Sequence, residues 1–448
     1  MFRKKHSLIK GTLILTSAGL VSRVLGFFFR IFLSHTFGEE QVGLYQLIFP
    51  FYALCLSLST SGLETAISRS VSRFHSLGRT QDGKLIFQTG LILSVLISLI
   101  CTLLVQKNSV FLSNRFLGDP RCATLLYLIV LALPAASVHS CICGYHYGLQ
   151  RTSVPAISQL IEQFVRISSV LVLYFIFIHR GVHPEIPLAV SGIIFGELAA
   201  AGYSLFSLKK KGFDADSPYI LSISKSCSEL LRLSVPLTVN RTAITFLQGI
   251  EAASIPVCLE LASHSASEAL SIYGVLTGMA LPCILFPSAL TNSVSLLLIP
   301  AVAQKQAESS SKETFLLIKK AAGGCFSLGL LCSVFLLTGS FLGNFLFHST
   351  LAGNFIVTLA WICPFLYTSS ALLSAINGLG LTTLTLMINL LGLSIRILSV
   401  YFGIPHYGIT GYLWGLFISQ STVCLVALLT LSHEIKKEYL QSFESATD

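Results

Sequence analysis

The stretch KGTLILTSAGLVSRVLGFFFRIFLSH, residues 10–35, decides the fold of this chain. After Lys10 its only charged residues are Arg23 and Arg30. About 20 predominantly apolar residues are enough for a helix to cross the hydrocarbon core of a bilayer. A basic start precedes the stretch, as in a signal peptide, but no small-residue cleavage site follows it. The stretch therefore predicts a first membrane span that is retained.

The composition extends this reading to the whole chain. Of 448 residues, 53% are hydrophobic and 11% are charged, and the mean hydropathy is +0.77. About a quarter of the residues of a typical soluble domain are charged, so this composition excludes a soluble enzyme, a secreted protein and a disordered scaffold. The 12 cysteines lie mostly inside apolar runs, without the spacing of a zinc site. We therefore predict no metal, no cofactor and no disulfide framework.

Apolar runs separated by charged or Gly/Pro-rich turns fill almost the whole chain. Their length fits helices, because a strand of a membrane barrel needs only about ten alternating residues. We expect an all-α polytopic membrane protein with 12 transmembrane helices. The predicted spans are residues 10–35, 42–68, 84–106, 122–147, 153–179, 186–208, 227–256, 267–302, 317–346, 351–377, 381–403 and 407–432.

The distribution of basic residues predicts the orientation. If the N-terminus is cytoplasmic, 19 of the 29 Lys and Arg residues fall on cytoplasmic segments and four fall on outer loops. This bias obeys the positive-inside rule, so we expect a multi-pass protein of the cell (plasma) membrane with both termini cytoplasmic. The net charge of +9 then lies largely in the loops and indicates no nucleic-acid partner. No predicted loop is long enough for a catalytic domain and no GxxxxGK[ST] motif occurs, so we predict no enzyme activity.

The two halves of the sequence repeat one another at a shift of about 230 residues. Pro134 then aligns with Pro364 and Gly148 with Gly378, and RISSV (166–170) aligns with RILSV (396–400). Each half holds six predicted spans, an even number, so both halves enter the membrane in the same direction. We predict a parallel pseudo-two-fold repeat with an N-terminal six-helix lobe (1–209), a cytoplasmic linker (210–226), a C-terminal six-helix lobe (227–433) and a cytoplasmic tail (434–448).

Several charged residues lie where lipid would exclude them, and each is a functional candidate because a charge at bilayer depth costs several kcal/mol unless it is compensated. Arginine suits an anionic head group, since its guanidinium binds phosphate bidentately and stays charged. The alternative is structural: Glu162 and Arg166 are four residues apart and can form an ion pair along their helix. The candidates for substrate binding are Arg23, Arg30, Arg166, Asn240 and Arg241, and those for ion coupling are Glu64, Glu162, Glu197 and Glu251.

Three further segments join the opening stretch: GYHYGLQRTSVPAISQLIEQFVRI (144–167), YGVLTGMALPCILFPSALTNSVSLLLIPAVAQ (273–304) and INGLGLTTLTLMIN (376–389). In this order and spacing they resemble the multidrug/oligosaccharidyl-lipid/polysaccharide (MOP) exporter superfamily. Within it the chain is most similar to the branch of stage V sporulation protein B, the polysaccharide biosynthesis flippases and the lipid II flippases. The resemblance runs from about residue 8 to 432.

This resemblance implies a MATE-like fold of two six-helix lobes and the flipping, by alternating access, of an undecaprenyl-pyrophosphate-linked sugar such as a lipid-linked oligosaccharide or lipid II. The precursor would serve cell-wall, spore-cortex or polysaccharide synthesis, with H⁺, Na⁺ or the membrane potential as the driving force. SRVLGF (22–27) matches the lipid II branch, so Arg23 carries over as a pyrophosphate contact and Arg30 as a nearby second. IYGVLTG (272–278) lacks the arginine that the lipid II flippases have there, and the two extra C-terminal spans of that branch have no counterpart.

Two other functions stay open. A drug or cation antiporter of the same superfamily would need an acidic cavity, whereas arginines outnumber glutamates within the spans. A non-transporting scaffold for wall-synthesis enzymes would leave the charges within the membrane without a purpose. A carrier of the major facilitator type also has six plus six spans, but only LGRTQDGK (77–84) faintly resembles that family.

Overall fold

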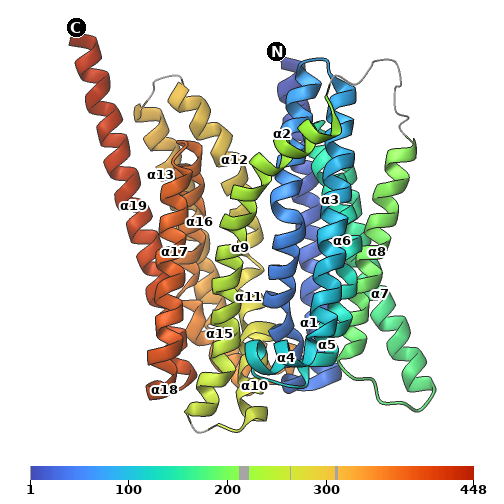
Figure 1. Ribbon diagram of the computed structural model, residues 1–448. Coiled ribbons are helices and arrows are strands. Elements are labelled where there is room, and N and C mark those ends of the chain that lie inside the picture. The colour runs from blue at the N-terminus through green and yellow to red at the C-terminus, as the bar shows by residue number, and fades with distance from the viewer. Residues whose placement is uncertain (1, 211–220, 263, 308–310, 448) are drawn as a thin grey trace. The chain divides into compact units, whose positions relative to one another are not determined.

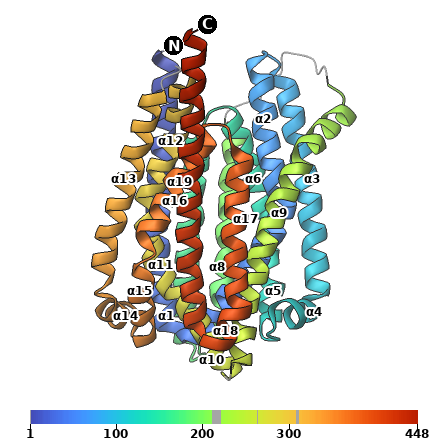
Figure 2. The same cartoon turned by 90° about the vertical axis from the view of Figure 1, so that its left-hand side faces the viewer.

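The computed structural model describes residues 2–210, 221–262, 264–307 and 311–447. These residues are almost entirely helical and contain no strand (Figures 1 and 2). The chain divides into two compact units, Met1–Ala253 (unit 1) and Ser254–Asp448 (unit 2). The all-α class predicted from the sequence is confirmed.

Unit 1 holds the helices that lead up to and include most of α9. They are α1 (Phe2–Leu56), the π-helix η1 (Ser57–Ser61), α2 (Gly62–Ser76), α3 (Thr80–Lys107), α4 (Ser109–Leu112), the π-helix η2 (Ser113–Leu117), α5 (Cys122–Ile129), the 3-10 turn η3 (Val130–Ala132), α6 (Leu133–Gly148), α7 (Ser153–His179), α8 (Pro187–Lys210) and α9 (Ile223–Leu261).

Unit 2 holds the last turns of α9 and the rest of the chain. Its elements are α10 (Ala266–Gly274), the π-helix η4 (Val275–Ala280), α11 (Leu281–Leu285), α12 (Ser288–Ala307), α13 (Ser311–Leu336), α14 (Gly339–Phe347), α15 (Thr350–Ala360), α16 (Cys363–Gly378), α17 (Thr382–Leu398), the π-helix η5 (Ser399–Gly403), α18 (Ile404–Tyr407) and α19 (Ile409–Thr447).

The first helical segment is long and apolar enough to cross a membrane twice. Its apolar part, Ile14–Ser76, has 63 residues and would be about 95 Å long if straight, three times the thickness of the hydrocarbon core. Gly38 breaks it with a φ of 78°, a left-handed conformation that glycine adopts without strain. With both arms counted, and with the bent pair α15–α16 counted as one span, the described residues give 12 crossings. The predicted number of spans is confirmed.

Three predicted spans differ from the structure in detail. The span predicted at 317–346 ends at Leu336, because a turn separates α13 from α14. The span predicted at 267–302 is interrupted between α11 and α12, where Pro287 lacks the N–H that would continue the helix. The span at 351–377 is two helices bent by 55°, with Pro364 in the first turn of α16. The last helix, α19, continues to Thr447, through residues predicted to be a tail.

Helix α9 packs along unit 1 although the sequence placed its residues in the second lobe. At its N-terminal end, Arg73 of α2 pairs with Glu229 at 2.6 Å. The next residue of α9, Leu230, is fully buried in a core cluster that includes Ile67 of α2 and Ile86 of α3.

The contact continues along the same helix. Ser57 and Thr242 lie 3.2 Å apart through their hydroxyl oxygens, and the rings of Phe116 and Phe246 have centroids 6.2 Å apart. Residues spaced by about four share a face of a helix, so a stripe of α9 lies against unit 1. This apolar and hydroxyl-lined stripe is the physical reason that the division falls after Ala253.

The repeat found in the sequence is present in the packing. Helices α6 and α16 begin and end at residues shifted by 230. A Cβ atom on Gly148 would lie 2.8 Å from the Ser68 carbonyl oxygen, and one on Gly378 would lie 2.9 Å from that of Ile299. Both glycines also face a valine three residues beyond that carbonyl, Val71 in unit 1 and Val302 in unit 2. The two halves therefore share a helix–helix contact residue for residue.

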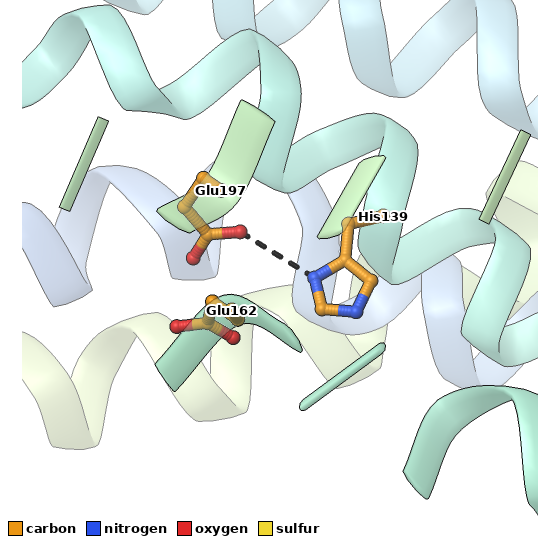
Figure 3. Close-up of side chains that lie close together, drawn as sticks. All are labelled: His139, Glu162 and Glu197. Carbon is orange, nitrogen blue, oxygen red and sulfur yellow. Dashed lines mark hydrogen bonds and ion pairs between the residues drawn. The ribbon is translucent and has the colours of Figure 1, made fainter. Parts of the chain in front are cut away.

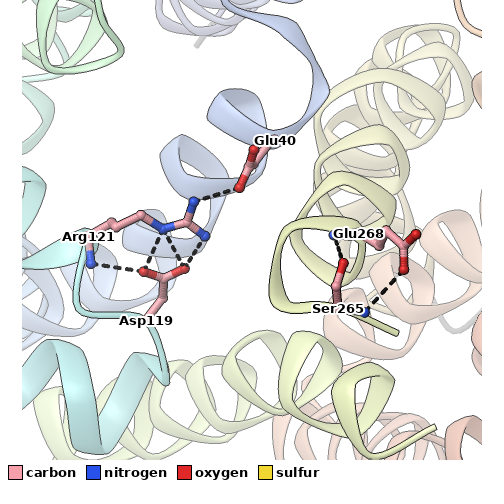
Figure 4. A network of polar contacts seen from close by, with 5 residues as sticks. All are labelled: Glu40, Asp119, Arg121, Ser265 and Glu268. Carbon is pink, nitrogen blue, oxygen red and sulfur yellow. Dashed lines mark hydrogen bonds and ion pairs between the residues drawn. The ribbon is translucent and has the colours of Figure 1, made fainter. Parts of the chain in front are cut away.

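Polar side chains fix the turns at the ends of the helices (Figure 4). Arg121 binds Asp119 at 2.7 Å and Glu40 at 2.5 Å, and so joins the segment before α5 to the bend of α1. Hydrogen bonds to Asp119 and then to Glu40 raise the pKa of Arg121 above its ordinary value, which keeps the side chain charged. In unit 2, Ser265 and Glu268 form a reciprocal capping box at the start of α10.

Replacing Gly196 of α8 by alanine is expected to lower the thermal stability, because the new Cβ would lie 2.8 Å from the carbonyl oxygen of Glu162. Overpacking of this kind costs about 1–3 kcal/mol. Gly202 lies on the same helix with nothing within 4 Å of an added Cβ, so Gly202→Ala is expected to cause no loss. Thermal unfolding of the purified variants in detergent checks this, and equal melting temperatures would contradict the close approach.

Candidate functional site

A buried ion pair on α7 forms the centre of the polar residues of unit 1. Glu162 and Arg166 are hydrogen-bonded across one helical turn, and their side chains are 18% and 20% exposed. The ion pair predicted from their spacing is confirmed. Each charge at this depth is compensated by the other, which is the condition under which hydrocarbon tolerates it.

Two glycines of α8 bring a second carboxylate next to this pair. Added Cβ atoms on Gly192 and Gly196 would lie 2.9 Å and 2.8 Å from the carbonyl oxygens of Arg166 and Glu162. The absence of side chains at these positions lets α7 and α8 approach closely, as the GxxxG spacing predicts. Glu197, the next residue, is buried at 8% exposure and faces Glu162 across the contact.

Glu197 interacts with a histidine that extends the site to α6 (Figure 3). The Nδ1 atom of His139 lies 3.4 Å from Glu197 Oε2, and its Nε2 atom lies 2.9 Å from Ser158 Oγ. Glu162 lies beneath both side chains in the same view. Helices α6, α7 and α8 thus each contribute one ionisable group to one location.

The polar region continues to α2 and α9. Ser140, next to His139 on α6, donates a hydrogen bond of 2.8 Å to Glu64 Oε2. Arg241 of α9 and His139 both lie close enough to Glu64 to interact with it electrostatically. Arg241 therefore compensates the charge of Glu64, and His139 adds to this when its ring is protonated.

Helix α1 closes the region from the other side. The hydroxyl of Tyr45 lies within electrostatic range of both Arg30 and Arg166. Tyr52 lies within range of Glu197 as well as the α7 pair. We use the term charged network for Glu64, His139, Glu162, Arg166 and Glu197, with Arg30 and Arg241 at its two margins.

The structure places the remaining predicted site residues outside this network. Arg23 is exposed on α1, and Asn240 is exposed on α9 beside Arg241. Glu251 is buried at 2% exposure further along α9. Six of the nine predicted residues therefore gather in one part of unit 1, from five helices.

Sequence reasoning missed His139 and Ser158. Neither is an acidic residue or an arginine, the types on which most of the prediction relied. His139 has no charged neighbour one turn away on α6, whereas Ser158 precedes Glu162 by one turn on α7. The feature of the sequence that could have indicated the site was His139 itself, a histidine in the middle of an apolar span. An ionisable group at that depth requires a partner from another helix.

The fold and site define a polytopic helical membrane transporter. The sequence matches the polysaccharide biosynthesis protein family over residues 8–305, and the chain belongs to that family. It is 29% identical to stage V sporulation protein B of Bacillus subtilis (strain 168), over 98% of this chain and 87% of that protein. It is 25% identical to the lipid II flippase MurJ of the same organism, over 66% of this chain and 58% of that protein.

Solved structures show the same fold. A multidrug resistance MATE family transporter of the MOP superfamily, in an inward-facing conformation, superposes with a TM-score of 0.68 at 15% identity, over 94% of this chain and 96% of that chain. A MOP superfamily transporter from Pyrococcus furiosus with a binding pocket of reversed polarity superposes with a TM-score of 0.65 at 14% identity, over 97% and 96% of the two chains. The resemblance to the MOP superfamily and the MATE-like architecture are confirmed.

Neutralising one partner of the α7 pair is expected to destabilise the protein more than neutralising both. Glu162→Gln or Arg166→Gln leaves a buried charge uncompensated, at a cost of about 3 kcal/mol, whereas the double variant leaves none. The exposed pair Arg73–Glu229 is the control, because its side chains are 55% and 23% exposed and such pairs contribute at most about 1 kcal/mol. Thermal unfolding of the two single variants, the double variant and the control Arg73→Gln tests this. A double variant less stable than either single one would refute the compensation.

Proposed function

We propose that this transporter flips a lipid-linked sugar diphosphate, with an undecaprenyl-pyrophosphate precursor of the cell wall, spore cortex or a polysaccharide as substrate. The observation that carries the proposal is the presence of Arg30, Arg166 and Arg241 at one charged network within the spans. Guanidinium groups bind diphosphate oxygens bidentately and stay charged when partly dehydrated. The similarity to a lipid II flippase supports the same substrate class.

The residues have distinct roles in this proposal. Arg241 is exposed on α9 and lies near Glu64. Its guanidinium can therefore bind the diphosphate while Glu64 holds the arginine side chain in place. Arg23, exposed on α1, and Asn240 contribute further polar contacts. Arg166 already forms an ion pair with Glu162, so it binds an anionic substrate less strongly than an arginine without such a partner would. The isoprenoid chain stays in the surrounding lipid.

The proposal includes an orientation and a driving force. The basic residues favour a plasma-membrane protein with cytoplasmic termini. An anionic head group moving outward gains about 2.3 kcal/mol per charge per 100 mV from a potential that is negative inside. Glu64 and Glu251 are our candidates for binding a coupled H⁺ or Na⁺ ion that returns the empty carrier.

A cation or drug antiporter is the second candidate. The observation that favours it is the group of carboxylates in unit 1 formed by the buried Glu197 and the part-buried Glu64 and Glu162, together with the fold shared with multidrug transporters. Two of these carboxylates are compensated by Arg166 and His139, which leaves little net negative charge to attract a cation. Drug efflux from cells that express the protein separates this candidate from a flippase.

Replacing Arg241 by alanine is expected to slow flipping about tenfold, because one charge-assisted hydrogen bond to phosphate contributes about 1.5–3 kcal/mol. Appearance of the lipid-linked precursor on the outer face, measured in cells or vesicles at matched protein levels, gives the rate. Arg232→Ala is the matched control: it removes an exposed arginine of the same helix outside the charged network. Unchanged flipping by Arg241→Ala, or equal loss in both variants, would overturn the assignment.

A further inference from the structure

We propose that His139, Glu162 and Glu197 form a binding site for a divalent transition-metal cation of the zinc class. One ligand atom from each residue lies within 4.8 Å of the other two. The three residues come from α6, α7 and α8, so the site joins three helices (Figure 3). The sequence alone predicted no metal, because its cysteines lack the spacing of a zinc site.

The hydrogen bonds of Ser158 determine which ring nitrogen of His139 faces the carboxylates as a lone pair. The Ser158 hydroxyl donates to the carbonyl oxygen of Pro155 at 2.9 Å. Its oxygen therefore accepts the 2.9 Å hydrogen bond from His139 Nε2–H. In the neutral imidazole, the unprotonated Nδ1 then points at Glu197. A cation therefore belongs between Nδ1 and the Glu197 carboxylate: either a second ring proton, which makes the His139–Glu197 ion pair, or a metal ion that displaces that proton.

The separation of the two groups favours a metal ion as that charge. His139 Nδ1 and Glu197 Oε2 are 3.4 Å apart, whereas a charge-assisted N–H···O hydrogen bond closes to about 2.7–2.9 Å. Two ligands on a tetrahedral zinc ion, at bond lengths of about 2.0–2.1 Å, are separated by about 3.4 Å. The distance therefore fits ligands on one ion better than a direct ion pair.

The surroundings are those of a metal site. Metal-binding histidines almost always donate their second ring N–H to a fixed acceptor, the role that Ser158 has here. Glu162 is oriented by Arg166 in the same way. One imidazole with two carboxylates suits zinc and neighbouring transition metals better than Na⁺ or Mg²⁺. Three protein ligands leave the fourth tetrahedral position for water or another ligand.

The charges also agree with this occupant. Two carboxylates offset the two positive charges of the ion, and Arg166 adds one positive charge beside them. The loaded site is then slightly cationic, as the neighbourhood of an anionic substrate should be. The inference goes beyond the proposed function, because metal binding is measured without transport and stands or falls independently of flipping.

The experiment uses the full-length protein without a histidine tag, stripped with a chelator and dialysed against Zn²⁺ in detergent. We expect one Zn²⁺ per chain by elemental analysis and a higher melting temperature in its presence. His139→Gln and Glu197→Gln each remove a ligand and are expected to abolish stoichiometric binding. Ser158→Ala keeps all three ligands but frees the ring, and is expected to weaken binding about 10–100-fold.

His146→Gln is the matched control, because His146 is also buried on α6, two turns from His139. It should bind Zn²⁺ as the unmodified protein does. Monodisperse elution and helical circular dichroism show which variants fold. If a variant that lacks a ligand does not fold, Ser158→Ala, which keeps all three ligands, still tests the site. No binding by the unmodified protein, or equal binding by His139→Gln or Ser158→Ala, would overturn the proposal.

Discussion

The constraint on which the charged network depends is that an ionised group within the hydrocarbon must be compensated by its neighbours. The Glu162–Arg166 pair meets this requirement within a single helix, whereas Glu197 of α8 meets it through His139 of α6, 3.4 Å away. The glycines of α8 allow the close approach to α7 that places Glu197 beside the Glu162–Arg166 pair. The close approach of the α7 and α8 backbones thus serves both the packing of the two helices and the assembly of the charged network.

Most of the architecture could be predicted from local features of the sequence. Span number follows from apolar length, and the pairing of Glu162 with Arg166 follows from their separation of four residues. The aligned glycines at 148 and 378 indicated the repeat correctly. Each of these features can be recognised from residues within one helix, or from the similarity between the two halves of the chain.

The features that could not be predicted depend on contacts between segments distant in the sequence. His139 acquires its significance from Ser158 and Glu197, which lie on two other helices. The association of α9 with unit 1 depends on Leu230 entering a core formed by α2, α3 and α6. Hydropathy shows that α9 is a span but contains no information on which neighbour covers it. The bends after Leu336 and before Cys363 likewise reflect packing.

The shared glycine contact of α6 and α16 also bears on the history of the chain. A gene duplication followed by divergence exchanges most side chains, because one apolar residue substitutes readily for another against lipid. A position where two backbones touch cannot drift in this way, since any side chain would separate the helices. Gly148 and Gly378 are therefore the positions at which the contact shared by the two halves is most constrained. In distant relatives, such points of backbone clearance should be a better guide to homologous helices than overall similarity.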